Sequence, residues 1–158
     1  MTGVQTCALP IFRDTLGSLG VESRFADFTD VEEVRSQIDD HTCALFFEII
    51  TNPQLFVADI RALANIAHQT GVPMIADTTI VPFSTFHAGE FGIDIEVISS
   101  TKYISGGGTG LGGLIVDYGK FDWTQSPSLH CKNERREWEK NLPLPQGSRQ
   151  NSSPISVL

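Results

Sequence analysis

Short apolar runs alternate with helical patterns along the middle of the chain. Residues 43–50 (CALFFEII) form a continuous apolar run, which is typical of a strand covered on both faces. Residues 72–78 and 95–100 have the same character, and residues 111–119 form a further buried-strand pattern. Residues 21–27 (VESRFAD) instead alternate between apolar and polar side chains, as a strand does. The pattern therefore predicts several short strands.

Two segments between these strands have helical signatures. Residues 30–38 (DVEEVRSQI) begin with Asp30 as an N-cap, have Glu33 three residues later, and repeat apolar residues at helical spacing. The segment after the first buried strand predicts a turn and then a helix from about Asp59 to a C-terminal cap at Gly71. Strands that alternate with helices through short connections predict an α/β fold, with a mostly parallel sheet and flanking helices.

Polar side chains gather where the predicted parallel strands end. Glu48 and Asn52 follow the first buried strand, Asp77 ends the second, and residues 99–102 (SSTK) end the third. Ligands of such sheets bind at the carboxyl ends of the strands. We therefore expect the three strand ends to form one crevice that binds a ligand.

Composition narrows the classes of function. The formal net charge of −8 argues against a nucleic-acid-binding surface, which normally carries a basic patch. The sequence has neither an apolar run long enough to span a membrane nor a signal-peptide pattern, so we expect a soluble, cytoplasmic protein. Its three widely spaced cysteines form neither a metal motif nor a disulfide framework. The sequence thus predicts no metal site and no partner among nucleic acids or membranes.

The first residues of the chain differ from its middle. Residues 1–11 (MTGVQTCALPI) resemble the conceptual translation of an adapter used in preparing sequencing libraries. The alternative is an ordinary apolar N-terminal segment. We favour the adapter, and therefore expect the natural protein to extend upstream of Phe12.

The last residues also change character. Residues 12–130 hold six basic and sixteen acidic side chains, whereas residues 131–158 hold five basic and three acidic ones and are rich in Pro, Ser, Asn and Gln. Such a composition buries too little apolar surface to order itself. The tail is either a disordered segment or the product of a reading-frame shift near His130, and we favour the frameshift. The ligand-binding domain is thus expected within residues 12–130.

Lys102 stands between three hydroxyl residues and a run of glycines in residues 99–113 (SSTKYISGGGTGLGG). Gly108, Gly110 and Gly113 satisfy the dinucleotide pattern G-x-G-x-x-G, but that fingerprint needs a helix after the glycines, and here a strand pattern follows. A phosphate-binding P-loop would need Gly-Lys-Ser/Thr, which is absent. Neither motif explains the lysine.

A covalent cofactor explains more of the pattern. A lysine amine forms a Schiff base with an aldehyde cofactor, the hydroxyls of Ser99 and Thr101 can hold a phosphate near it, and Asp77 could keep a pyridine nitrogen protonated. These are the three parts that a pyridoxal 5'-phosphate (PLP) site requires. From the residues alone, a surface lysine, an aspartate that caps a turn and hydroxyls that end a strand remain open alternatives.

Residues 12–130 closely resemble the Cys/Met-metabolism family of PLP-dependent enzymes. The resemblance rests on Glu48 with Asn52-Pro53, then Asp77, then Ser99-x-Thr101-Lys102, with 25 residues from Asn52 to Asp77 and 25 from Asp77 to Lys102. It implies part of the large cofactor-binding domain of a fold-type I, aspartate aminotransferase-like enzyme. It also implies a role for each residue of the motif. Lys102 would be the Schiff-base lysine and proton shuttle, Asp77 the partner of the pyridine nitrogen, Ser99 and Thr101 phosphate ligands, Asn52 a neighbour of the ring hydroxyl, and Glu48 the acid that supports the Asn52 loop.

One residue departs from the family pattern. Thr78 stands where the family usually has asparagine after the aspartate. This departure leaves Asp77 intact but weakens the assignment of the chain to one subgroup of the family.

Within the family, residues 105–123 (SGGGTGLGGLIVDYGKFDW) most resemble the O-acetylhomoserine sulfhydrylases. The implied reaction replaces the γ-acetate of O-acetylhomoserine with sulfide or a thiol, giving homocysteine or methionine, in a parent that is a homotetramer. Cystathionine γ-synthase, cystathionine γ-lyase or methionine γ-lyase activity, or a non-catalytic module that binds a phosphate ligand, remain alternatives.

The family supplies further site residues from regions with no counterpart in residues 12–130. These are a glycine turn for the phosphate, a tyrosine that stacks on the ring, and an arginine for the substrate carboxylate. We therefore expect this chain to be a catalytically incomplete fragment.

Overall fold

A four-stranded sheet forms the centre of the molecule. The computed structural model describes residues 10–124 and residue 126, so residues 1–9 of the predicted adapter segment and the whole predicted tail lie outside the described residues. The strands lie side by side in chain order: β1 (Leu45–Glu48), β2 (Met74–Asp77), β3 (Ile95–Ser99) and β4 (Gly113–Asp117). The first three are mutually parallel and β4 runs antiparallel to β3. The predicted mostly parallel sheet is confirmed.

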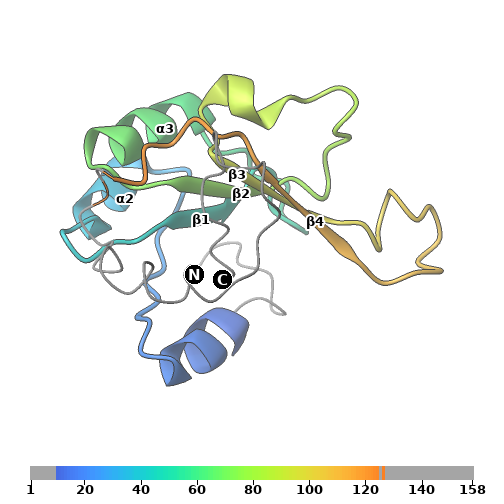
Figure 1. Cartoon of the computed structure of the whole chain (residues 1–158), viewed down its shortest axis with the longest axis horizontal. Coiled ribbons are helices and arrows are strands. Elements are labelled where there is room, and N and C mark those ends of the chain that lie inside the picture. Colours follow the sequence, from blue (N-terminus) through green and yellow to red (C-terminus); the bar gives the residue numbers. More distant parts are fainter. Residues whose placement is uncertain (1–9, 125, 127–158) are drawn as a thin grey trace, which may run out of the picture.

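Helices lie on both sides of this sheet. Figure 1 shows α2 (Val31–Gln37) and α3 (Ile60–Gln69) on one side, and the short π-helix η1 (Ile11–Leu16) on the other. A 3-10 turn, η2 (Ala88–Phe91), leads into β3. No helix in the described part of the chain is both long and apolar enough to cross a bilayer.

The signals that predicted the two α-helices are confirmed. The Asp30 side chain accepts hydrogen bonds from two N–H groups in the first turn of α2, at 3.0 and 3.1 Å. Asp59 caps α3 by accepting the N–H of Ala62 at 3.1 Å. Gly71 follows α3 with φ 70°, the left-handed conformation that glycine adopts without steric cost.

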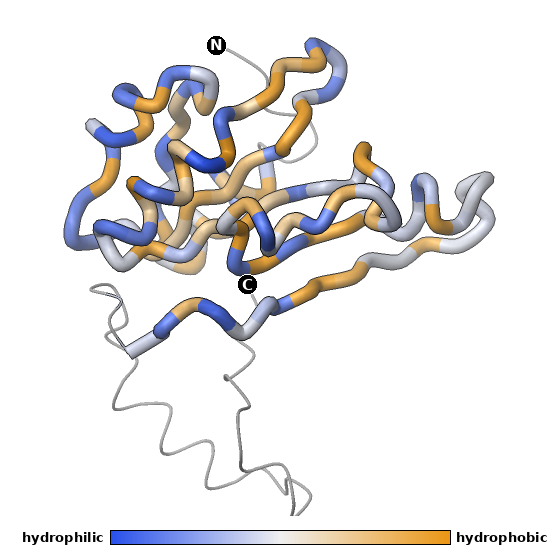
Figure 2. The backbone as a smooth tube through the Cα atoms, turned by 90° about the horizontal axis from the view of Figure 1, so that it is seen from above, coloured by the Kyte–Doolittle hydropathy of each residue, from blue (hydrophilic) through white to orange (hydrophobic). Residues whose placement is uncertain are grey.

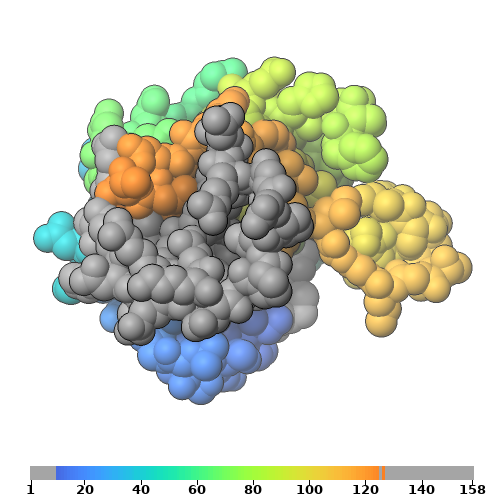
Figure 3. Space-filling model, viewed as in Figure 1, coloured from blue at the N-terminus to red at the C-terminus, as the bar shows by residue number. Residues whose placement is uncertain are grey.

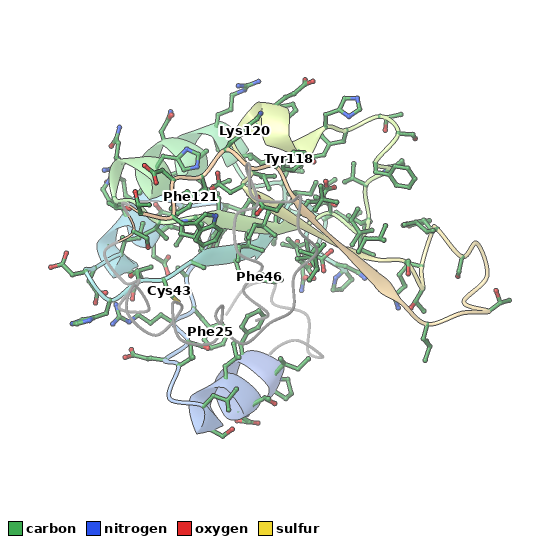
Figure 4. All side chains as sticks on the ribbon, viewed as in Figure 1. Phe25, Cys43, Phe46, Tyr118, Lys120 and Phe121 are labelled. Carbon is green, nitrogen blue, oxygen red and sulfur yellow. The ribbon has the colours of Figure 1, made fainter. Side chains whose placement is uncertain are left out.

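The core lies between the sheet and α2 and α3. Leu45 and Phe47 of β1 are buried against it, while the intervening Phe46 is only half-buried. Phe46 points to the opposite side and packs on Phe12 near η1, with ring centroids 4.8 Å apart (Figure 4). The expectation that residues 43–50 are covered on both faces is therefore met only in part for β1: one face is buried, and the other is half-buried.

The predicted strand at residues 21–27 is also absent. This segment has no regular secondary structure and joins no ladder within residues 10–124. Its polar groups are satisfied in other ways: Arg24 pairs with Asp39 at 2.6 Å, and the hydroxyl of Ser23 donates to the carbonyl of Phe12 at 2.8 Å. Alternation of polar and apolar side chains is therefore not enough to form a strand, because a strand also needs a neighbouring strand to bond with.

The last strand is shorter and more exposed than predicted. The apolar run at residues 111–119 contributes only Gly113–Asp117 to the sheet, and every residue of β4 is exposed. Leu114 and Ile115 are 46% and 73% exposed. Among the residues that the structure describes, β4 pairs with β3 alone and is an edge strand. Figure 2 shows hydrophobic positions along it. In Figure 3 the segment before it, residues 100–112, stands out from the body of the molecule.

Candidate functional site

The carboxyl ends of β1, β2 and β3 lie at one edge of the sheet. Glu48 is the register partner of Asp77, and Asp77 is the partner of Val97. Ser99 therefore lies two residues beyond Asp77 on the neighbouring strand and on the same face. With strands about 4.8 Å apart and a rise of about 3.3 Å per residue, these two positions are roughly 8 Å apart. This spacing leaves room for a small planar ligand between an acid and a hydroxyl.

Glu48 joins β1 to the loop that follows it. Its Oε2 accepts the backbone N–H of Asn52 at 3.2 Å. Burial and the negative charge of the neighbouring Asp77 raise the pKa of Glu48, while the hydrogen bond from Asn52 acts in the opposite direction. The structure thus brings Glu48, Asn52 and Asp77 together, and Asn52 stays exposed.

The Asn52 loop has internal bonds of its own. The N–H of Thr51 donates to the carbonyl of Phe56, and the hydroxyl of Thr51 accepts the N–H of Phe56, both at 2.9 Å. An isolated antiparallel bridge between Ile50 and Val57 closes the base of the loop. These contacts fix the shape of the loop that carries Asn52.

Thr79 links the ends of β2 and β3. Its N–H donates to Oδ1 of Asp77 at 2.8 Å, and its Oγ1 accepts the N–H of Ser99, also at 2.8 Å. Sequence reasoning missed this residue. The bond to Asp77 is a local turn in which an aspartate accepts the N–H two residues on, a tendency that the sequence does signal. The bond to Ser99 spans 20 residues and could be found only in the folded chain.

Lys102 lies in a tight turn directly after β3. The turn begins where the N–H of Lys102 donates to the carbonyl of Ser99 at 3.3 Å. The Lys102 side chain is exposed and forms no ion pair with the residues that the structure describes. The turn therefore places Lys102 three residues after Ser99 with its side chain exposed.

The glycines pack against this turn rather than starting a helix. Oγ1 of Thr101 accepts the N–H of Gly112 at 3.1 Å. A side chain at Gly112 would collide with the Ser100 hydroxyl, since a Cβ there would lie 2.7 Å from it. After Gly113 the chain enters β4. The rejection of a dinucleotide fingerprint is confirmed, because no helix N-terminus follows these glycines.

Thr78 faces away from the candidate site. It is 1% exposed, and its hydroxyl donates to Oε1 of the buried Glu96 at 2.5 Å. Oε2 of Glu96 accepts the hydroxyl of Tyr118 at 2.6 Å, and Figure 4 shows Tyr118 on the side of the sheet that α3 covers. Burial and Glu96 raise the pKa of Tyr118. The one residue that departs from the family pattern therefore belongs to the core face, not to the Asp77 face.

A small apolar hollow of about 170 Å³ adjoins Thr79 and Ser99. It lies between the segment after β2 and the turn that carries Lys102. Its wall is lined by Thr79, Val81, Pro82, Phe83, Ile98, Ser99, Tyr103 and Ile104. Thr79 and Ser99 are both half-buried and line this hollow.

Comparison with known proteins identifies the family of this chain. Residues 3–134 match the family described as Cys/Met metabolism PLP-dependent enzymes. The chain is 39% identical to a homocysteine synthase of Schizosaccharomyces pombe over 142 residues, which cover 85% of this chain and 30% of the relative.

Solved structures of similar proteins have the same fold. An O-acetylhomoserine sulfhydrylase of Wolinella succinogenes superposes with a TM-score of 0.73 at 45% identity, covering 84% of this chain and 37% of that one. A Campylobacter jejuni chain solved with a pyridoxyl-lysine phosphate gives a TM-score of 0.71 at 33% identity, covering 73% and 29%. The sequence described here thus spans about a third of the length of these proteins.

Proposed function

Because the chain belongs to the Cys/Met metabolism family of PLP-dependent enzymes, we propose that its strand-end residues form the family's cofactor site. The observation that carries this proposal is the convergence of three strand ends, joined by the Glu48–Asn52 bond and by Thr79. The proposed site consists of Glu48, Asn52, Asp77, Ser99, Thr101 and Lys102.

The available polar groups fit PLP. The N–H of Thr79 donates to Oδ1 of Asp77, and Oδ2 of the same carboxylate can accept the N–H of a protonated pyridine. Ser99 lies on the same face of the sheet as Asp77, where its hydroxyl can donate to a phosphate. When bound, PLP would act as an electron sink for a carbanion at the substrate α-carbon.

Lys102 is the proposed catalytic residue. Its amine is exposed on the turn after Ser99, so it can bond to the cofactor aldehyde and later carry protons between substrate carbons. Asn52 would orient the ring from the side of β1, and Glu48 would hold the Asn52 loop in place.

We propose γ-replacement as the reaction of the whole protein. In O-acetylhomoserine the bond from Cγ to the acetate oxygen breaks and a bond from Cγ to sulfur forms, so sulfide gives homocysteine and acetate leaves. Similarity to the S. pombe homocysteine synthase and to the W. succinogenes O-acetylhomoserine sulfhydrylase supports this substrate class. We further propose a cytoplasmic homotetramer for the whole protein, with the 158-residue chain alone binding cofactor without turnover.

Labelling of this chain tests the site. PLP and then borohydride, which converts the bond between a lysine amine and the aldehyde carbon into a stable secondary amine, should modify Lys102 at substoichiometric PLP. Lys120 is the internal control, because its amine already donates to the carbonyl of Gly89 at 3.0 Å. We expect Lys102 to carry at least about tenfold more label than Lys120, a difference of about 1.4 kcal/mol, and Ser99→Ala to reduce only the Lys102 label. Equal labelling of both lysines by peptide mapping would contradict the site.

The full-length parent tests the reaction. Supplied with O-acetylhomoserine and sulfide, it should release homocysteine and acetate in equal amounts, and Lys102→Ala in the same parent should abolish turnover. Release of a 2-oxo acid and ammonia without incorporation of sulfide would show γ-elimination instead. That result would reject γ-replacement while leaving the cofactor site intact.

A further inference from the structure

Thr79 completes the sheet where β2 has already ended. The ladder between β2 and β3 closes with the N–H of Thr78 donating to the carbonyl of Val97 at 3.0 Å. If the parallel ladder continued, a main-chain carbonyl of the β2 segment would accept the next N–H of β3 that points toward β2, which is that of Ser99. Here the Oγ1 of Thr79 accepts it, from Ser99 at 2.8 Å.

This contact anchors the start of the lysine turn. On the other side of β3, Ser99 is the register partner of Gly113, and Ser100 donates its N–H to Gly112 at 3.0 Å. The carbonyl of Ser99 accepts the N–H of Lys102. Thr79 is therefore the only described side chain that fixes Ser99 from the β2 side, and the same residue holds Asp77 through its N–H.

We propose that Thr79 is a positioning residue of the cofactor site, which sets the Ser99 hydroxyl at the place where it meets the cofactor phosphate. This inference rests on the proposed function. The two contacts of Thr79 are separable: valine at residue 79 removes the oxygen that accepts from Ser99 but keeps the N–H that donates to Asp77. Loss of the Thr79 hydroxyl should therefore weaken binding of the cofactor phosphate and leave binding of the ring and reaction of the Lys102 amine unchanged.

Two aldehydes distinguish an effect on the phosphate end of the site from an effect on the ring and the amine. PLP and pyridoxal share the ring and the aldehyde, but pyridoxal has no phosphate. For Thr79→Val we expect the PLP concentration that gives half-maximal borohydride labelling of Lys102 to rise about three- to tenfold, as for the loss of one hydrogen bond. Half-maximal labelling by pyridoxal should stay within about twofold of the unmodified chain. Thr79→Ser keeps the hydroxyl and should restore the PLP value.

A structural role gives a different result. If Thr79 merely stabilised the fold, valine would weaken labelling by both aldehydes in the same proportion, and that outcome, or no change with either, would overturn the inference. Should Thr79→Val fail to fold, Thr79→Cys replaces the hydroxyl with a thiol, which is a weaker acceptor. It must then weaken PLP labelling relative to Thr79→Ser, and equal values for the two variants would also overturn the inference.

The same experiment distinguishes failure of this inference from failure of the proposed function. If the unmodified chain shows no PLP label on Lys102, the cofactor site itself is wrong. If it is labelled but Thr79→Val does not discriminate between PLP and pyridoxal, only the role of Thr79 is wrong. A Ser99→Ala, Thr79→Val double variant adds a check: it should label no more weakly with PLP than Ser99→Ala alone, because Thr79 acts through Ser99.

Discussion

Glu48 and Asp77 place two acids on neighbouring strands at the edge of the sheet. Burial and the Asp77 charge raise the pKa of Glu48 above its ordinary value of 4.5. The folded chain therefore keeps a proton on Glu48 at pH values where the unfolded chain releases it. Between these two pKa values the free energy of unfolding falls as the pH rises, because the unfolded chain binds fewer protons.

Replacing this acid by its amide tests that consequence. Glu48→Gln has the charge removed but retains an oxygen that accepts the N–H of Asn52. Relative to the unmodified chain, the variant should gain at most about 0.5 kcal/mol at pH 7, since the group is partly exposed, and the gain should shrink toward pH 4.5. Urea unfolding at several pH values measures it. Glu22→Gln, at an exposed site, should show no such trend, and a gain independent of pH for Glu48→Gln would contradict the argument.

At the scale of the elements, one glycine lets α3 approach the start of β3. Gly92 ends η2 with φ 94°, and a Cβ there would lie 2.6 Å from the Cβ of Ala64 in α3. The next residues, Ile93 and Asp94, are buried. Oδ2 of Asp94 accepts the N–H of Met74 at 2.8 Å and lies 2.9 Å from Nε2 of His68. The close approach of α3 therefore requires glycine at residue 92, three residues before β3 begins at Ile95.

Alanine scanning of two glycines separates backbone strain from packing. Gly20 has φ 82° but no atom within 4 Å of a Cβ. Gly20→Ala should cost about 1–2 kcal/mol of unfolding free energy from the left-handed backbone alone. Gly92→Ala adds a collision with α3, so we expect a cost larger by about 1–3 kcal/mol. Urea unfolding of both variants gives the difference, and equal costs would mean that α3 moves aside freely.

At the scale of the whole molecule, the sheet has an apolar edge. β4 carries Leu114, Ile115 and Val116 in the open, at 46%, 73% and 37% exposure. An exposed hydrophobic edge strand offers unpaired backbone groups to another chain. We infer that the 158-residue chain self-associates through this edge in solution.

A charge on the edge should suppress that association. Ile115→Lys places a lysine on β4, and lysine on an edge strand disfavours pairing with another strand. Leu19→Lys is the matched control, because Leu19 is also 73% exposed but lies outside the sheet. Sedimentation velocity should show a smaller associated fraction for Ile115→Lys only. An equal reduction for both variants would indicate a general effect of charge rather than pairing through β4.

The sequence by itself determined much of this protein. Local chemistry is enough to start a helix at Asp30 or at Asp59 and to end one at Gly71, because caps depend on neighbouring residues in the chain. Continuous apolar runs identified β1, β2 and β3, and their order placed Glu48, Asp77 and Ser99 at one edge. The motif residues pointed to the family before any geometry was known.

Only the tertiary structure decided the rest. Whether residues 21–27 join a sheet and whether β4 is buried both depend on neighbours that alternation or apolarity does not specify. The face taken by Thr78 follows from the register of β2, and its partner Glu96 is 18 residues away. The role of Thr79 depends on a hydrogen bond to a strand 20 residues further on. Contacts between distant segments exist only after the chain has folded, so they leave no local pattern in the sequence.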